Sequence, residues 1–290
     1  MRIVRIAALP VTLGICALMA GLLSVPVSAA SFTGGPPSSI AAQVAQNSAF
    51  GATETAANAA KTAAFKDGDL KGYEPLTEHY EQLMPGIVCC GQFSREATTT
   101  LVQYAQDTTY YCGPAVVSEM SASVYGPSPT GLSQYTVAAY MGTNSSGTNP
   151  SQELNGLNYY VGDPDFGPSE AYAFVSVSWN PTTTQEDEFQ QDLDWDVNIG
   201  TPVAAGVYEV GDPYYPADQS LYPHLVGHPF QDTIQHWAAV GGYNWNDDEV
   251  YYADSATYMN QFGGGWAVPA HSWYSLANME ELLGGEGFIW

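Results

Sequence analysis

The stretch QDTTYYCGP covers residues 106–114 and places Gln106 six residues ahead of Cys112. Pro114 suits the first turn of a helix, where its missing N–H costs nothing. Apolar residues then recur at helical spacing at positions 116, 117, 120 and 124, before Gly126 and Pro127 end the pattern. The sequence therefore predicts a helix that begins at Cys112.

A cysteine at a helix N-terminus is in a good position to ionise. The helix dipole and the unpaired backbone N–H groups stabilise a thiolate, and a nearby imidazolium can lower a thiol pKa from about 8.5 to well below neutrality. Gln106 lies one loop earlier, so its amide can point to an oxyanion that develops beside the Cys112 backbone N–H. We expect Cys112 to be a nucleophile and Gln106 an oxyanion donor. The alternative is a buried cysteine that merely starts a helix.

A second chemical cluster, QHWAAVGGYNWNDDEVYYADSA, covers residues 235–256. Residues 234–240 and 250–254 are predicted to form a hairpin around a polar turn at 244–249. His236 and Asp254 have the same parity at the outer ends of these strands. We expect their side chains to be neighbours on one face, unless the Gly241–Gly242 pair shifts the register heavily. Asp254 would then orient the His236 imidazole as a general base.

The remaining patterns predict an α+β fold. Helical character is found at 135–141, 151–160 and 189–197, whereas 171–179 and 201–208 read as strands. An N-terminal helical half would thus carry Cys112, and a C-terminal antiparallel sheet would carry His236 and Asp254.

The N-terminal part divides into two segments ahead of this domain. Residues 1–30 combine Arg2 and Arg5 with an apolar run and a small-residue exit, the pattern of a cleaved signal peptide, so we expect a secreted protein. Residues 31–75 are rich in Ala, Ser, Thr and Gly and are interpreted as a low-complexity linker or pro-segment. The domain itself is predicted to cover 76–290.

The charge balance restricts the partners. The chain has 30 acidic and six basic residues, a formal net charge of −24. Such a protein lacks a basic patch for nucleic acid, and we expect no membrane association once the signal is removed. Oligomeric state leaves no signal in the sequence.

The other cysteines and histidines receive structural interpretations. Cys89 and Cys90 are adjacent, and three cysteines in a mature chain leave at least one thiol unpaired. His224, His228 and His271 are predicted to be exposed loop histidines. Their spacing implies no third ligand, so we expect no metal site.

With these residues in view, the chain from about 98 to 256 resembles the cysteine peptidase family 39-like group, relatives of bacteriocin-processing double-glycine peptidases within the papain-like fold. The resemblance rests on Gln106 and Cys112, on the loop GTNP at 147–150, and on His236 with Asp254. It implies a Cys112 nucleophile, a His236 base and acid, an Asp254 orienter and a Gln106 oxyanion donor. Double-glycine processing enzymes are typically fused to an ABC transporter, whereas this chain shows an export signal, so the substrate stays open.

The function expected from the sequence is a secreted cysteine peptidase that hydrolyses a peptide or protein substrate without a cofactor. Two alternatives remain at this stage. One is a cell-wall amidase or acyl transferase with the same thiol chemistry, and the other is an inactive papain-like module used for binding.

Overall fold

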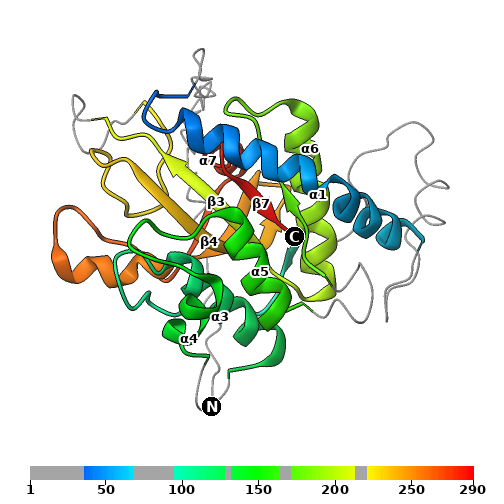
Figure 1. Cartoon of the computed structure of the whole chain (residues 1–290), viewed down its shortest axis with the longest axis horizontal. Helices are drawn as coiled ribbons and strands as arrows, with labels where there is room; N and C mark the ends of the chain where they lie inside the picture. Colours follow the sequence, from blue (N-terminus) through cyan, green and yellow to red (C-terminus); the bar gives the residue numbers. More distant parts are fainter. Residues whose placement is uncertain (1–35, 68–94, 128–131, 163–170, 213–220) are drawn as a thin grey trace, which may run out of the picture.

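The computed structural model describes residues 36–67, 95–127, 132–162, 171–212 and 221–290. The signal peptide expected at 1–30 and the Cys89–Cys90 pair lie outside the described residues. Within them, an antiparallel sheet is packed between helices, which confirms the predicted α+β class (Figure 1).

The sheet has the strand order β2-β7-β3-β4-β5-β6, with β1 paired to the far end of β4. All of its pairings are antiparallel. The bounds are β1 Glu96–Thr98, β2 Phe174–Val175, β3 Val203–Glu209, β4 Ile234–Asn244, β5 Glu249–Ala253, β6 His271–Ser275 and β7 Gly287–Ile289. The strand predicted over 171–179 is therefore much shorter than expected, and β1 was not predicted at all.

The helices are α1 Ala41–Asp67, α3 Cys112–Tyr125, α4 Gln134–Met141, α5 Pro150–Tyr160, α6 Thr183–Ile199 and α7 Leu276–Leu282, with a 3-10 helix, η2, at Ser255–Phe262. The helix predicted from Cys112 is confirmed, and Gly126 follows it with a φ of 84°. The helix predicted at 189–197 begins earlier, because Thr182 and Gln185 form a reciprocal capping box before it.

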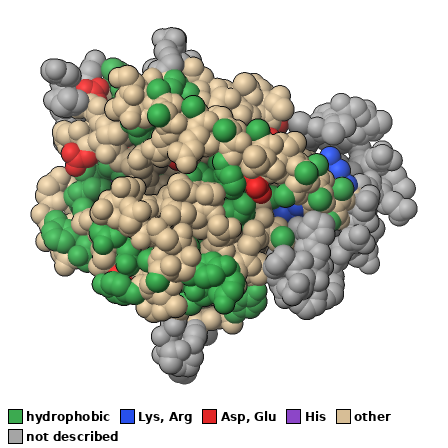
Figure 2. All heavy atoms as spheres, in the orientation of Figure 1, with side chains coloured by type: hydrophobic (Ala, Val, Ile, Leu, Met, Phe, Trp, Pro, Cys, Tyr) green, Lys and Arg blue, Asp and Glu red, His purple; other side chains and the backbone are tan. Residues whose placement is uncertain are grey.

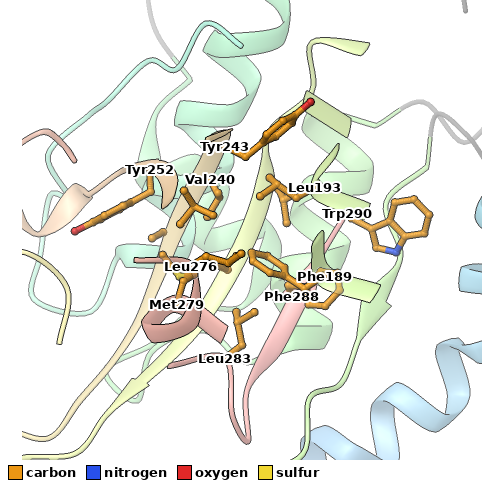
Figure 3. Packing of buried hydrophobic residues seen from close by; sticks show 14 of the residues in the cluster. Phe189, Leu193, Val240, Tyr243, Tyr252, Leu276, Met279, Leu283, Phe288 and Trp290 are labelled. Carbon is orange, nitrogen blue, oxygen red and sulfur yellow. The ribbon is translucent and has the colours of Figure 1, made fainter. Parts of the chain in front are cut away.

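Two hydrophobic clusters divide the molecule. In β3, Val203, Ala205 and Val207 belong to one cluster and the intervening Ala204 to the other, as the two-residue period of a strand requires. The first cluster contains side chains of α6, α7 and the C-terminal strand, as Figure 3 shows. The second contains Cys112 and the apolar residues of α3, α4 and α5. The helix that begins at Cys112 thus packs directly on β4.

The segment interpreted as a linker or pro-segment includes a long helix. α1 packs against β2 and α5, and its Phe65 side chain is buried in the first cluster. Asn47 donates to Glu286 and to the Gly285 carbonyl, both at 3.0 Å. Lys61 lies 3.3 Å from Asp196. Residues 41–67 are therefore folded onto the sheet edge formed by β2, rather than free as a spacer.

Basic side chains are few on the face drawn in Figure 2, where hydrophobic side chains are scattered among polar atoms. In the described part of the chain, no helix combines the length and the apolar character that a membrane span requires.

Candidate active site

Cys112 is the first residue of α3 and is a buried, free thiol. No side chain caps this helix, and Pro114 contributes no N–H. The N-terminal peptide groups of α3 therefore remain directed at the thiol and at whatever approaches it.

His236 and Asp254 are neighbours, as the sequence predicted. His236 Nε2 lies 2.9 Å from Asp254 Oδ1, and both side chains are buried. The contact depends on an irregularity in the hairpin, because the β4–β5 register shifts between Val240 and Gly242. With Ala239 opposite Ala253 after that shift, Asp254 comes diagonally across from His236 on the same face.

Cys112 and His236 shift each other's pKa toward the charged forms. Burial alone would raise the pKa of the Cys112 thiol, but the hydrogen bond and charge of His236 lower it, helped by the backbone N–H groups of Trp237 and Gly113. Burial would lower the pKa of His236, whereas the charge and hydrogen bond of Asp254, and then Cys112, raise it well above the usual value. Because Nε2 is bonded to Asp254, Nδ1 is the nitrogen left for Cys112.

Gln106 is buried on the loop that precedes α3. Its Nε2 donates to the Thr108 carbonyl at 2.7 Å, and its Oε1 accepts from the Ser255 hydroxyl at 3.2 Å. Its backbone N–H donates to the Ser255 carbonyl at 2.9 Å. The side chain is thus tied to the segment that follows Asp254, and one amide hydrogen stays free of these contacts.

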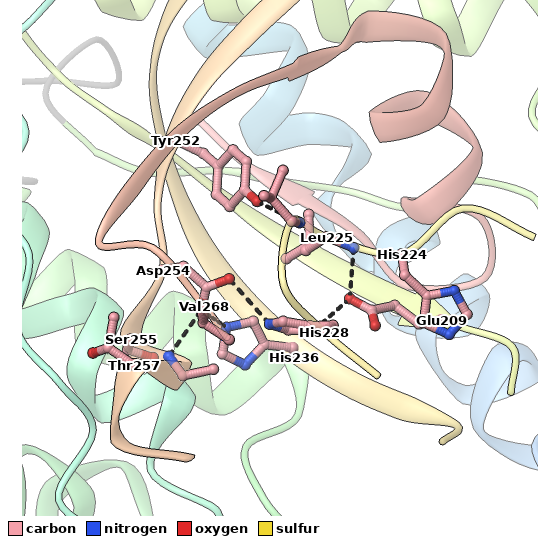
Figure 4. A network of polar contacts seen from close by, with 12 residues as sticks. Glu209, His224, Leu225, His228, His236, Tyr252, Asp254, Ser255, Thr257 and Val268 are labelled. Carbon is pink, nitrogen blue, oxygen red and sulfur yellow. Dashed lines mark hydrogen bonds and ion pairs between the residues drawn. The ribbon is translucent and has the colours of Figure 1, made fainter. Parts of the chain in front are cut away.

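The prediction that His224, His228 and His271 are exposed loop histidines is wrong. His224 and His228 are buried, and His271 is half-buried in β6, where its Nε2 lies 2.9 Å from the Leu101 carbonyl. His228 lies in the site: its Nε2 is 3.1 Å from Asp254 Oδ2 and its Nδ1 is 2.8 Å from Glu209 Oε1 (Figure 4). Sequence spacing could not predict this contact. The turn that carries His228 precedes β4, and it comes close to Asp254 only when the sheet is folded.

Two buried glutamates, Glu119 on α3 and Glu153 on α5, were also missed. Glu119 accepts from the Tyr104 N–H at 2.8 Å, and neither oxygen of Glu153 has a hydrogen-bond partner among the described residues. Burial raises the pKa of both carboxyls well above the usual value, and the nearby Cys112 raises that of Glu153 further. Both shifts favour the neutral acid, so they oppose a negative charge on either glutamate in this part of the core.

His228, His236 and Asp254 each offer one possible metal ligand atom, and these atoms lie within 4.8 Å of one another. However, each imidazole Nε2 lies at hydrogen-bond distance from its own carboxylate oxygen. The nitrogens thus carry protons in this arrangement, and a metal ion would have to displace them.

A thiol at a helix N-terminus, bonded to a histidine on an antiparallel sheet, defines the class: this is a papain-like cysteine peptidase. The family follows from the sequence match. Residues 98–278 match the model of the Peptidase_C39 like family, and the chain belongs to that family.

Solved structures with similar folds share little sequence with this chain. The peptidase domain of Streptococcus ComA, a bifunctional ABC transporter, has 13% identity and a TM-score of 0.37, covering 66% of this chain and 96% of its own. A putative C39-like peptidase from Bacillus anthracis has 11% identity and a TM-score of 0.39, covering 67% and 96%. Xylellain, a cysteine protease from Xylella fastidiosa, has 13% identity and a TM-score of 0.42, covering 67% and 84%. No curated protein matches the sequence.

Proposed function

We propose that the protein is a secreted peptidase in which Cys112 is the nucleophile, His236 the general base and acid, Asp254 the orienting carboxylate and Gln106 an oxyanion donor. The observation that supports this most strongly is the continuous chain from Cys112 to His236 to Asp254, with the last contact at 2.9 Å. The signal-like sequence at 1–30 supports export.

In the proposed reaction, the Cys112 thiolate attacks the carbonyl carbon of a peptide bond, and a C–S bond forms while the carbonyl electron pair moves onto oxygen. The Cys112 N–H and the free amide hydrogen of Gln106 receive this oxyanion. As the tetrahedral intermediate collapses, His236 gives its Nδ1 proton to the departing amine. The acyl enzyme and a neutral His236 remain.

Water completes the cycle. Neutral His236 removes a proton from a water molecule, whose oxygen attacks the thioester carbon, and the Cys112 thiolate leaves with its bonding electrons. Asp254 keeps His236 in the tautomer that presents Nδ1 to the reaction in both half-reactions. The products are a carboxylic acid and a free amine, and the starting ion pair is restored.

The test compares wild type with Cys112→Ala on a peptide library and on peptidoglycan fragments. We expect peptide cleavage by the wild type and none by the variant, with the same thermal unfolding midpoint in both. Cleavage of peptidoglycan amides alone would instead identify a cell-wall amidase. Peptide hydrolysis retained by Cys112→Ala would overturn the assignment. Mass spectrometry of the culture supernatant checks export and reveals whether residues 31–75 are removed.

A further inference from the structure

His228 occupies a site between two carboxylates. Its Nδ1 lies 2.8 Å from Glu209 Oε1 and its Nε2 lies 3.1 Å from Asp254 Oδ2, and its side chain is fully buried (Figure 4). Asp254 accepts a hydrogen bond from Nε2, and the 2.8 Å contact of Nδ1 with Glu209 is an ion pair, so both ring nitrogens carry protons. The geometry therefore defines an imidazolium held by two acceptors.

The contact completes the hydrogen bonding of Asp254. Oδ1 accepts from His236 Nε2 at 2.9 Å and from the Ala256 N–H at 2.8 Å, and His228 binds Oδ2. With both oxygens held, the carboxylate cannot rotate away from His236. The charges then alternate from Glu209 through His228, Asp254 and His236 to Cys112.

The turn that carries His228 is held independently on several sides. The Leu225 N–H donates to Glu209 Oε1 at 3.2 Å, and the Val226 N–H donates to the Tyr252 hydroxyl at 2.9 Å. Gly227 has a φ of 82°, and a Cβ there would lie 2.3 Å from the Ala267 oxygen, so this position requires glycine. The backbone thus aims the His228 ring at Asp254.

The charged and titratable groups around His228 come from three strands. Glu209 ends β3, His236 lies on β4 with its ring 5.4 Å from that of His228, and Tyr252 and Asp254 come from β5 and the residue after it. Trp266 lies 4.9 Å from the His228 ring and is half-buried. The charge of Asp254 adds to burial in raising the pKa of the Glu119 carboxyl on α3. Although burial opposes it, the charges of Glu209 and Asp254 raise the pKa of His228 to about 9.

We propose that His228 is a positioning residue for catalysis: as an imidazolium it keeps Asp254 ionised and directed at His236, and Glu209 keeps His228 charged. This rests on the proposed function of Cys112, His236 and Asp254. Without the His228 charge, Asp254 loses one of the two positive charges that keep it ionised in its buried position. Asp254 is then ionised in a smaller fraction of the molecules and stabilises the His236 imidazolium less. The fraction of Cys112 present as thiolate therefore falls.

The experiment measures the rate of Cys112 alkylation by iodoacetamide from pH 4 to 9, which requires no substrate. Four forms are compared: wild type, His228→Gln, the double variant Glu209→Gln/His228→Gln, and His224→Gln. His224 is a buried histidine of the same segment, but its ring nitrogens lie near the Tyr222 and Asp232 carbonyls, so it serves as the matched control. Unfolding midpoints are recorded for all four.

We expect His228→Gln to lower the alkylation rate at pH 6 at least tenfold and His224→Gln to leave it within about twofold. The double variant should recover part of the loss, because it also removes the Glu209 charge, which disfavours an ionised Asp254 once His228 no longer lies between them as a cation. Equal losses in the single and double variants, with lower unfolding midpoints, would reduce His228 to a packing role and overturn the proposal. A wild-type Cys112 that alkylates only near pH 8.5 would overturn the proposed function itself.

A second measurement leaves His228 in place. Histidine-selective NMR should show wild-type His228 doubly protonated up to about pH 9. In Glu209→Gln its titration should move at least one pH unit lower, since Glu209 is the largest cause that raises its pKa. A wild-type His228 that titrates near 6.5 would contradict the proposal even if the glutamine variants do not fold.

Discussion

Asp254 lies diagonally across the β4–β5 hairpin from His236, and its Oδ1 is 2.9 Å from the imidazole Nε2. Burial raises the pKa of Asp254, but the charges and hydrogen bonds of His236 and His228 hold it well below the usual range. The carboxylate is therefore ionised throughout the pH range in which a Cys–His pair functions.

Replacing Asp254 by Asn should keep the side-chain shape and remove the charge. We expect kcat/KM to fall roughly 10²- to 10⁴-fold, because the buried His236 imidazolium loses its counter-charge. As the pH rises above 6, the residual activity should also decline at a lower pH than in the wild type, since the pKa of His236 falls. A full pH–rate profile checks this, and an unchanged alkaline limb would contradict the role of Asp254.

Replacing Gln106 by Ala should lower kcat by roughly 10²- to 10³-fold with little change in KM, the expected result of removing one oxyanion donor. Steady-state kinetics on a cleaved peptide measure the split. Ser255→Ala is the matched comparison, because it removes the hydroxyl that donates to Gln106 Oε1 and leaves the amide in place. Ser255→Ala should lower kcat much less than Gln106→Ala does. A Gln106→Ala enzyme within about twofold of wild type would remove Gln106 from the mechanism.

Replacing Lys61 by Met should show that α1 is part of the stable fold. Lys61 is buried, pairs with Asp196 at 3.3 Å and lies 4.5 Å from the centre of the Trp290 ring. Burial raises the pKa of Asp196 to about 6 against the opposing effect of Lys61. Above that pH, the unpaired buried carboxylate should cost about 3–5 kcal/mol of unfolding free energy.

At pH 4.5, the same Lys61→Met change should cost much less, because Asp196 is then protonated. Urea unfolding at pH 4.5 and pH 8 measures the difference. Lys66→Met changes an exposed lysine of the same helix and should have little effect at either pH. Equal costs at both pH values would contradict the buried ion pair.

Stability should be greater in mild acid than at pH 8. Burial raises the pKa of Asp194 to about 6 and those of Glu280 and Glu286 to about 7. A carboxyl whose pKa is raised by folding contributes stability that is complete below about pH 4 and is lost as the pH rises through 6 to 7. The thermal unfolding midpoint should therefore be higher at pH 5 than at pH 8.

Glu280→Gln tests one contributor to this slope. Gln190 donates to Glu280 Oε1 at 2.7 Å, a bond that the amide oxygen of the new side chain can accept. The variant should lose less stability than wild type between pH 5 and pH 8. Glu96→Gln, which changes an exposed acid of β1, should keep the wild-type slope. Identical slopes in all three proteins would rule out Glu280 as a contributor.

The site could be predicted from the sequence as far as local patterns reach. Pro114 and the apolar spacing after Cys112 predicted a helix start, and the observed helix begins at that residue. The contact of His236 with Asp254 was predicted too, but from a parity argument that assumed no register shift, and the contact exists only because the register shifts at Gly241. The helix inference succeeded because helix periodicity depends on neighbours within a few residues.

Other features depended on contacts between distant segments. Next to its turn, the hairpin pairs Asn244 with Glu249. If this register continued unchanged, Asp254 would lie opposite Ala239, and the side chains of Asp254 and His236 would be on opposite faces of the sheet. The register shift at Gly241 brings the two side chains onto the same face. The Cβ of a larger residue there would lie 3.0 Å from Leu101 Cδ1, on a segment far away in sequence.

The sequence alone determined the candidates for the proposed chemistry, because a thiol at a helix N-terminus and a histidine on a strand follow from local spacing. Tertiary structure alone decided the environment of those residues. It brought His228 from a turn to Asp254, buried Glu209 beside it, and folded α1 onto β2 at the edge of the sheet. The reason is physical: burial and pairing set the charge of a titratable group, and both arise only when segments distant in sequence pack together.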